Sequence, residues 1–305
     1  MKKTFAVIIA ALTSMSFAGC DDYSEVTVAE TTDTAITETQ REEEISEPAE
    51  KENATIEETV LFDENGVKLT ALALDYEYIS WVELKLLIEN NSGEELKLNC
   101  HSVSVNGYMI NESMYIKAAD GEKIEDSLTL NYMYLEDCGI DEIADIEFTL
   151  DIFDTELENY TDSSVVRICT TAAETFEYTY DDSGEPVYNE NDFKIVVRGI
   201  DEDASFIGPG MIVYIENNSD RDVTVYVEDE YVNGVEMDAV FACPIAPGKR
   251  AVDTVVFWDF DLEENKITTI EEVSLYFYIT DGDTCETIIN TEPVNVQFHQ
   301  STTRN

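Results

Sequence analysis

The chain has 305 residues, of which 44% are hydrophobic, and this composition is typical of a globular protein. Lys and Arg together number 17 against 67 Asp and Glu, which gives a formal net charge of -50. So acidic a chain is repelled by nucleic acid and by anionic membrane surfaces, which excludes nucleic acid as a partner and favours cationic ones.

The N-terminus has the regions of a secretory signal. Two lysines follow the first residue, residues 5–12 form an apolar run, and two small residues stand before Cys20. The apolar run is too short to span a bilayer as a helix. The segment resembles the lipobox of bacterial lipoproteins, although Phe17 stands where that motif usually has Leu.

This resemblance implies that residues 1–19 are removed and that Cys20 becomes the lipid-bearing N-terminus. The membrane is then a partner through the lipid, and the mature chain is anchored to the outer face of the bacterial cell membrane. The alternative is ordinary signal-peptide cleavage after Ala18, because Ser16 and Ala18 satisfy a small-x-small pattern. No later segment of the sequence has the length and apolarity of a membrane span.

Residues 20–57 have the composition of a linker. From Asp21 to Glu57 there are 13 acidic and 2 basic residues, many threonines and almost no large apolar side chains. Such a segment buries too little apolar surface to offset its chain entropy, and its like charges repel one another. We expect a disordered, extended, acidic stalk.

Beyond the linker the sequence repeats itself. The pentapeptide IENNS occurs at 88–92 and again at 215–219, an offset of 127 residues. Aligned at that offset without gaps, residues 89–154 and 216–281 share 16 identities in 66 positions. The sequence therefore predicts two homologous domains, residues 58–180 and 185–299.

Each copy alternates apolar and polar residues with the period of a β-strand. The dipeptides Asn106-Gly107 and Asn233-Gly234 are strong signals for two-residue hairpins. Short helical turns are expected only within 134–143 and 261–270. About seven turn-separated strands per copy are typical of an antiparallel sandwich. We therefore expect an all-β fold with two tandem antiparallel immunoglobulin-like β-sandwich domains.

The turn motifs carry a resemblance. They are IENNSD at 215–220, VNG at 232–234, APGK at 246–249 and LEEN at 262–265. They resemble turns of the immunoglobulin-like domains in surface lipoproteins of Gram-positive anaerobes. The resemblance covers both repeats and implies a sandwich fold displayed at the cell surface. Because the motifs are turns, they specify the fold more than an activity.

The cysteines after Cys20 do not recur at the 127-residue offset, so the two copies share no disulfide framework. They are Cys100, Cys138, Cys169, Cys243 and Cys285. Cys100 and Cys243 lie in apolar strand contexts, and we expect both to be buried. A bridge such as Cys100 with Cys169 stays open, because spacing does not decide pairing.

Metal and cofactor sites are not expected. There is no C-x-x-C motif and there are only two histidines, which disfavours zinc. Four acidic turns, at 63–66, 181–184, 201–203 and 281–283, supply oxygens that could coordinate Ca²⁺, but Asp and Gly are also what hairpin turns prefer. Calcium binding is therefore a minor alternative.

Catalysis is also not expected. Cys100 and His101 are adjacent, and neighbouring strand residues point to opposite faces, so they should not form a nucleophile–base pair. The usual motifs of serine hydrolases, zinc peptidases and phosphate-binding loops are missing from the sequence. We predict that the chain is not an enzyme.

Two aromatic residues, Trp258 and Tyr132, are speculative ligand-binding residues, with the sandwich core as the alternative place for them. The function we expect is binding or adhesion at the cell surface, with an envelope glycan or a surface protein as partner. The alternative is a structural or envelope-maintenance spacer without a dedicated ligand. An exposed apolar patch would favour binding, and uniformly acidic domains would favour the spacer.

Overall fold

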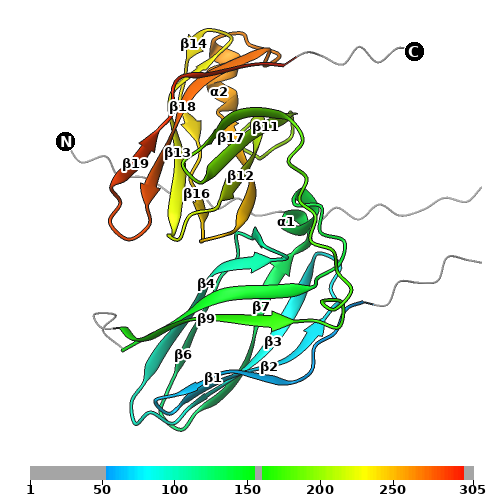
Figure 1. The fold of residues 1–305 in the computed structure, drawn as a ribbon, viewed down its shortest axis with the longest axis vertical. Helices are drawn as coiled ribbons and strands as arrows, with labels where there is room; N and C mark the ends of the chain where they lie inside the picture. Colours follow the sequence, from blue (N-terminus) through cyan, green and yellow to red (C-terminus); the bar gives the residue numbers. More distant parts are fainter. Residues whose placement is uncertain (1–52, 155–159, 299–305) are drawn as a thin grey trace, which may run out of the picture. The chain divides into compact units, whose positions relative to one another are not determined.

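The computed structural model describes residues 53–154 and 160–298, whose regular secondary structure is almost entirely β-strand (Figure 1). Cys20 and most of the expected linker lie outside the described residues. The all-β fold with antiparallel sheets is confirmed, and it is consistent with immunoglobulin-like sandwiches. Within the described ranges, no helix has the length and apolarity that crossing a membrane requires.

The elements of the first repeat run from residue 59 to residue 169. They are β1 (Thr59–Glu64), β2 (Val67–Asp75), β3 (Trp81–Asn90), β4 (Leu96–Val105), β5 (Tyr108–Met109), β6 (Met114–Ala118), β7 (Lys123–Asn131), α1 (Tyr132–Asp137), β8 (Asp145–Phe153) and β9 (Tyr160–Cys169).

The second repeat has the same order with small changes. Its elements are β10 (Glu185–Glu190), β11 (Phe193–Asp201), β12 (Gly210–Asn217), β13 (Val223–Val232), β14 (Val235–Glu236), β15 (Ala239–Val240), β16 (Cys243–Ile245), β17 (Arg250–Phe257), α2 (Asp259–Glu264), β18 (Glu272–Asp281), β19 (Thr287–Asn290) and β20 (Val294–Gln297). Adding 127 to the bounds of β4, β5 and α1 reproduces those of β13, β14 and α2. The duplication seen in the sequence is therefore also a duplication of the backbone.

The strands form three sheets. One has the order β1-β2-β3-β7, and another has the order β14-β13-β18-β19 with β16 and β20 beside it. The third has ten strands in the order β10-β11-β12-β17-β5-β4-β8-β9, with β15 and β6 off this path. It passes from one repeat to the other through a parallel bridge between Arg250 of β17 and Tyr108 of β5. The other strand pairs are antiparallel.

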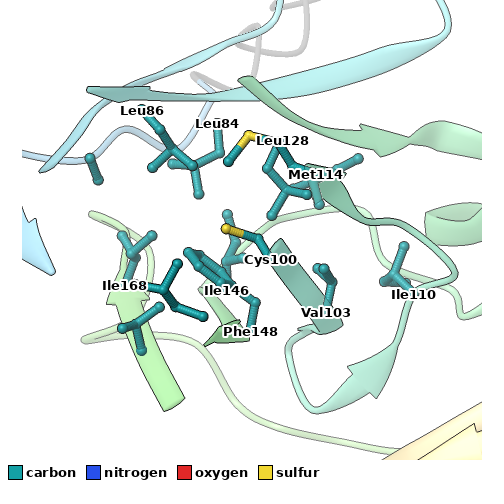
Figure 2. Packing of buried hydrophobic residues seen from close by; sticks show 14 of the residues in the cluster. Leu84, Leu86, Cys100, Val103, Ile110, Met114, Leu128, Ile146, Phe148 and Ile168 are labelled. Carbon is teal, nitrogen blue, oxygen red and sulfur yellow. The ribbon is translucent and has the colours of Figure 1, made fainter. Parts of the chain in front are cut away.

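The hydrophobic core follows from the alternation in the strands. Along β3, Leu84 and Leu86 are fully buried while their neighbours are partly exposed. They face Cys100, Ile146 and Phe148 from β4 and β8 across the first repeat (Figure 2). A separate cluster around Phe257 and Phe277 fills the second repeat. Burying each such side chain contributes about 1.5–3 kcal/mol, so these two clusters are the main source of stability.

The IENNS motif is more than a turn. Asn90 and Asn217 are fully buried. The amide nitrogen of Asn217 donates to the carbonyls of Arg221 and Ile245, at 2.9 Å in each case. Its amide oxygen accepts from the backbone nitrogen and the hydroxyl of Ser219. The side chain therefore connects the end of β12 to two loops.

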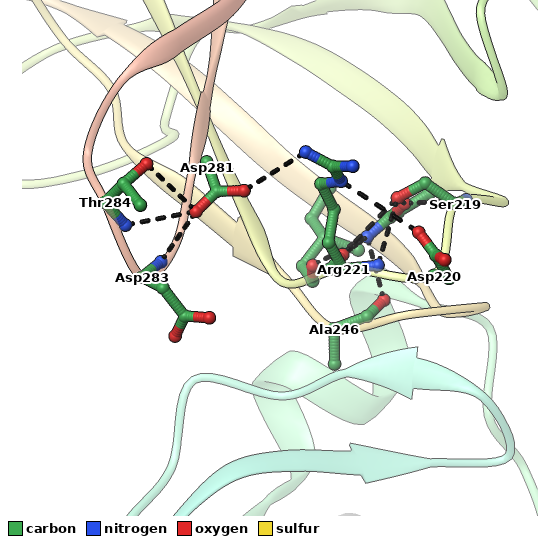
Figure 3. A network of polar contacts seen from close by, with 9 residues as sticks. Ser219, Asp220, Arg221, Ala246, Asp281, Asp283 and Thr284 are labelled. Atoms are coloured by element: carbon green, nitrogen blue, oxygen red, sulfur yellow. Dashed lines mark hydrogen bonds and ion pairs between the residues drawn. The ribbon is translucent and has the colours of Figure 1, made fainter.

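Asn90 makes the equivalent bonds in the first repeat. Its amide nitrogen donates to the carbonyls of Glu94 and Ala118, and its amide oxygen accepts from Ser92. In the second repeat an additional ion pair lies nearby, between Arg221 and Asp281 (Figure 3). The repeated motif is thus explained by a buried amide that satisfies loop carbonyls in both copies.

The hairpins and helical turns expected from the sequence are present. Asn106 and Gly107 have φ of 52° and 83°, as a two-residue primed turn requires, and Asn233 and Gly234 have 51° and 77°. The two helices, of six residues each, fall at equivalent positions. Each begins two residues before the expected segment, because the backbone amides of residues 133 and 261 already bond to the N-cap residues Asn131 and Trp258.

The two repeats pack against each other. Val196 and Tyr214 of the second repeat are buried in the hydrophobic cluster of the first. The guanidinium of Arg250 lies over the ring of Tyr180, 3.7 Å from its centroid. Lys249 forms an ion pair with Glu147 at 2.6 Å. The described residues belong to one compact unit, so the division into domains at 58–180 and 185–299 remains a prediction.

Candidate functional site

Each repeat has one tryptophan near the end of a strand pair. Trp81 lies at one end of the β3–β7 pair, and Trp258 lies at the same end of the equivalent pair, β12–β17. In the first repeat, Trp81 of β3 is the register partner of Asn131 of β7. In the second repeat β12 pairs with β17, with Gly210 opposite Val256. Continuing that register by two residues places Gly208 opposite Trp258. The 127-residue offset missed this relation, because Trp81 begins β3 in the first copy, whereas Trp258 follows β17, the equivalent of β7, in the second.

Large apolar side chains are exposed beside each tryptophan. Ile79 in the β2–β3 loop is 97% exposed, and Phe206, at the equivalent position, is 99% exposed. Met133 on α1 is 55% exposed, and Phe260, at the equivalent position on α2, is 59% exposed. Contiguous exposed apolar patches mark interaction sites on soluble proteins, so the positions shared by both copies are candidates for contact with a partner.

Backbone hydrogen bonds hold the loop and the helix together at this end. The amide of Tyr132 donates to the carbonyl of Ser80 at 3.0 Å, and the amide of Asp259 donates to the carbonyl of Ile207 at 3.0 Å. A Cβ atom on Gly208 would lie 2.2 Å from the carbonyl oxygen of Phe257, so only glycine allows this close approach. We call these surfaces the first apolar tip (Tyr78, Ile79, Trp81, Met133) and the second apolar tip (Phe206, Trp258, Phe260).

The aromatic rings within each tip contact one another. Tyr78 stacks on Trp81 with centroids 4.9 Å apart and an interplanar angle of 20°. Trp258 and Phe260 have centroids 5.4 Å apart. Trp258, one of the two aromatic residues predicted to bind a ligand, is half-buried at the start of α2 and belongs to the second tip.

Tyr132, the other predicted binding residue, is placed differently. It is half-buried and packs against the hydrophobic cluster of the first repeat. It also lines a small cavity with Tyr76 and Leu135. Its equivalent in the second repeat is Asp259. The exposed residue next to it, Met133, was missed, because nothing in the strand alternation marks the first turn of so short a helix.

Acidic residues flank the second tip along the chain. Asp201 at the end of β11 and Glu202 and Asp203 in the loop that follows are exposed, and Asp259 is exposed in the first turn of α2. These carboxylates attract cationic groups and repel anionic ones. The second tip therefore offers apolar and ring faces next to negative charge.

A polar cluster lies at a bulge in β4. His101 bonds with both ring nitrogens: Nδ1 is 2.9 Å from Oγ of Ser102, and Nε2 is 2.8 Å from Oδ2 of Asp151. The hydroxyl of Ser163 donates to Oδ1 of Asp151 at 2.6 Å. His101, Ser102 and Asp151 line a cavity of about 1320 Å³. The sequence analysis considered His101 as a base only for Cys100, and it did not consider Ser102 as a partner of His101.

The buried cysteines are poor nucleophiles. Cys100 and Cys243 are buried, as expected, and Cys138 is buried too. Burial raises the pKa of the Cys100 and Cys138 thiols to about 12, so both stay protonated at neutral pH. All five described cysteines are free thiols, and Cys100 is not bridged to Cys169.

The acidic turns use their carboxylates internally. Oδ1 of Asp281 accepts from the backbone nitrogens of Asp283 and Thr284, and Oδ2 accepts from Arg221. The carboxylates of Asp181 and Asp201 each accept from the backbone nitrogen two residues later in the chain. Within the ranges that the structure describes, no three His, Cys, Asp or Glu side chains gather as a metal site.

Comparison with known proteins assigns no family. No family model matches the chain, and no curated protein matches it. Among solved structures, a transglutaminase from red sea bream is similar over 80% of this chain and 31% of that chain, with 7% identity and a TM-score of 0.19. The chain thus spans less than a third of the length of that structure.

This match contradicts the prediction that the chain is not an enzyme, and we withdraw that prediction. It was based on missing sequence motifs, and such motifs do not report side chains that only folding brings together. At a TM-score of 0.19, the match carries no argument for a transglutaminase activity or for any other particular reaction.

Proposed function

We propose that the chain is a lipid-anchored, extracytoplasmic binding protein whose ligand is held at the apolar tips. The observation that carries the proposal is the repetition of exposed apolar residues at equivalent positions, Ile79 with Phe206 and Met133 with Phe260. A fold does not need such residues, because any polar side chain fits an exposed position. Their presence in both copies supports selection for contact with a partner.

The ligand class follows from the rings and the charge. Tryptophan and tyrosine faces stack on sugar rings and anchor protein partners. The surrounding carboxylates disfavour anionic ligands. An envelope glycan without acidic groups, or a basic segment of a surface protein, fits both properties. The lipid on Cys20 and the acidic stalk would hold the tips away from the membrane.

The test is binding of the fragment from residue 53 to residue 305 to a glycan array and to a set of basic peptides. Replacing Phe206 and Phe260 together by Ser should weaken binding by at least about tenfold, the effect of losing one interface anchor. The matched control replaces the exposed Val165, far from the tips in sequence, by Ser. Equal binding by both variants, with unchanged melting curves, would reject the tip as the binding site.

A second candidate function is a spacer without a dedicated ligand. The observation that favours it is the set of contacts between the repeats, namely the shared sheet, the Arg250–Tyr180 contact and the Lys249–Glu147 ion pair. Such contacts suit a spacer that must keep its length. Absence of any bound glycan or peptide, together with unchanged surface display when the tips are replaced, would favour the spacer.

A further inference from the structure

The polar cluster at the β4 bulge has the arrangement of an activated nucleophile. A nucleophile is recognised by a base within about 2.6–3.2 Å and by a third group that orients the base. Here Ser102 Oγ is 2.9 Å from His101 Nδ1, and Asp151 Oδ2 is 2.8 Å from Nε2. Asp151 is itself buried and held by Ser163, so the carboxylate that orients the ring is fixed.

The bulge explains how neighbouring residues come to contact each other. The register of β4 against β8 runs from His101 opposite Thr149 to Ser104 opposite Glu147, so β4 has one extra residue. Ser102 lies in this extra segment with a φ of 49°, in the left-handed region. A bulge re-aims side chains that would otherwise alternate between faces, and here it turns the hydroxyl to the imidazole.

The second repeat provides an internal comparison. It has the same bulge, between Glu228 and Tyr231, and Asp229 has a φ of 55°. At the positions of His101, Ser102 and Asp151 it has Glu228, Asp229 and Tyr278. The fold therefore requires the bulge, but it does not require the Ser–His–Asp set.

We propose that Ser102 is the nucleophile of an acyl-transfer site that hydrolyses esters. With the imidazole proton on Nε2, His101 Nδ1 accepts the hydroxyl proton while Ser102 Oγ attacks the ester carbonyl. The bond to the leaving alcohol breaks, and the alcohol takes the proton from His101. Water then attacks the acyl-serine, giving its proton to Nδ1, and the acid is released as the hydroxyl of Ser102 is restored.

Asp151 is a positioning residue in this scheme. It accepts the hydrogen bond from Nε2–H, fixes the tautomer that leaves Nδ1 free to take a proton, and stabilises the imidazolium that forms. It does not touch the substrate. Its effect is therefore on the rate of attack and not on the affinity for the ester.

The cavity sets the substrate class. It offers about 1320 Å³ and apolar contacts from Met109 and Ile110 for an acyl chain. Carboxylates including those of Asp222 and Asp283 line it, and Arg198 is the one arginine or lysine among its described lining residues. The substrate is accordingly a neutral or cationic ester, and anionic esters are disfavoured. This activity goes beyond ligand binding at the tips and does not depend on it.

The test is covalent labelling of the full chain with an alkyl fluorophosphonate. Attack by Ser102 Oγ on phosphorus breaks the P–F bond, fluoride leaves, and His101 takes the hydroxyl proton. We expect one adduct, mapped to Ser102 by mass spectrometry of the unsubstituted chain. His101→Gln and Asp151→Asn should each lower the labelling rate constant by about 100-fold without changing the concentration for half-maximal rate.

The controls distinguish a reactive serine from a general effect on the fold. Asp229→Ala changes the equivalent bulge position of the second repeat and should leave labelling at Ser102 unchanged. Melting curves identify variants that fail to fold. The mapping on the unsubstituted chain needs no variant, and an adduct absent from Ser102, or equally frequent on Ser104, overturns the proposal.

Discussion

The two repeats have the same backbone and different side chains at their bulges and tips. At the bulges, His101, Ser102 and Asp151 in one copy stand where Glu228, Asp229 and Tyr278 stand in the other. At the tips, by contrast, both copies have large apolar residues, with the tryptophan at the start of β3 in the first copy and after the end of β17 in the second. The exposed apolar residues of the tips are thus common to both copies, as the proposed binding function requires, whereas the Ser–His–Asp set at the bulge is found in the first copy alone.

Positions that determine the backbone have changed least. Asn90 matches Asn217, and Asn106 matches Asn233, and each pair makes the same hydrogen bonds. Each of these amide groups supplies a donor and an acceptor to the neighbouring loops. The comparison therefore separates residues that the fold needs from residues that a partner or a reaction needs.

The largest expected effect is at the buried asparagines. Asn217→Ala removes the amide that donates to the carbonyls of Arg221 and Ile245 and accepts from Ser219, and each buried group left unsatisfied costs about 1–3 kcal/mol. Asn90→Ala should lower the free energy of unfolding by the same amount, because it removes the donor to the carbonyls of Glu94 and Ala118. We expect either variant to lose about 2–4 kcal/mol in urea unfolding.

The matched controls are the next residues in the motif, Asn91→Ala and Asn218→Ala. Both side chains are exposed. The backbone nitrogen of Asn91 donates to the carbonyl of Gly66, and the substitution does not remove this bond. Their cost should stay within about 0.5 kcal/mol. Equal costs at residues 217 and 218 would contradict the role given to the buried amide.

A smaller effect on the free energy of unfolding is expected to distinguish the two hairpin asparagines, Asn106 and Asn233. Asn106 is 3% exposed and its amide group bonds to Glu142, Ala144 and Asp145. Asn233 makes equivalent bonds but is exposed to water. Because water can replace the lost partners only at residue 233, Asn106→Ala should cost about 1–2 kcal/mol more than Asn233→Ala in urea unfolding. Equal costs would show that burial at this turn does not matter.

Much of the fold was predictable from the sequence. Strand alternation and the Asn-Gly pairs are local signals, and they predicted the β-class, the hairpins and the repeat. The single-sheet connection between the copies was not predictable, because it depends on Arg250 meeting Tyr108 across 142 residues of chain, a contact that no local pattern encodes.

Less of the candidate sites was predictable. Trp258 is an aromatic residue near a turn, a feature visible in the sequence, and its role in binding stays a prediction; Phe206 is isolated in the sequence and becomes notable only through its exposure. The Ser102–His101 contact required the extra residue in β4, which reverses the alternation that the sequence argument assumed. Bulges depend on pairing with another strand, so they escape a reading of one strand alone.

A pair of identical residues sharpens the comparison further. Asp126 and Asp253 are equivalent, but Asp126 is exposed while Asp253 packs beside Cys243. Burial raises the pKa of Asp253 above its usual value, because the ionised form loses hydration. A raised pKa means that the charged form is penalised, so stability falls as the pH rises through that pKa.

Replacing the carboxylate by a neutral amide should therefore raise stability at residue 253 and not at residue 126. Asp253→Asn should raise Tm by a few degrees at neutral pH and flatten the dependence of Tm on acidic pH. Asp126→Asn is the matched control and should leave both unchanged. A lower Tm for Asp253→Asn would mean that its carboxylate is stabilised by partners and not penalised by burial.

The smallest expected effect is confined to alkaline pH and to the first repeat. Burial raises the pKa of Tyr76 from 10.0 to about 12, whereas the equivalent residue in the second repeat is the exposed Asp203. The neutral phenol is favoured in the folded chain. Its contribution to stability is therefore complete below pH 10 and is lost as the pH rises toward 12.

Tyr76→Phe cannot ionise, so the loss of stability between pH 10 and pH 12 should be smaller in this variant than in the unsubstituted chain. The measurement is urea unfolding at both ends of that interval. Tyr78→Phe, at an exposed ring of the first apolar tip, controls for losing one hydroxyl. If both variants follow the unsubstituted chain, the alkaline transition comes from other groups, and the buried phenol does not distinguish the two repeats.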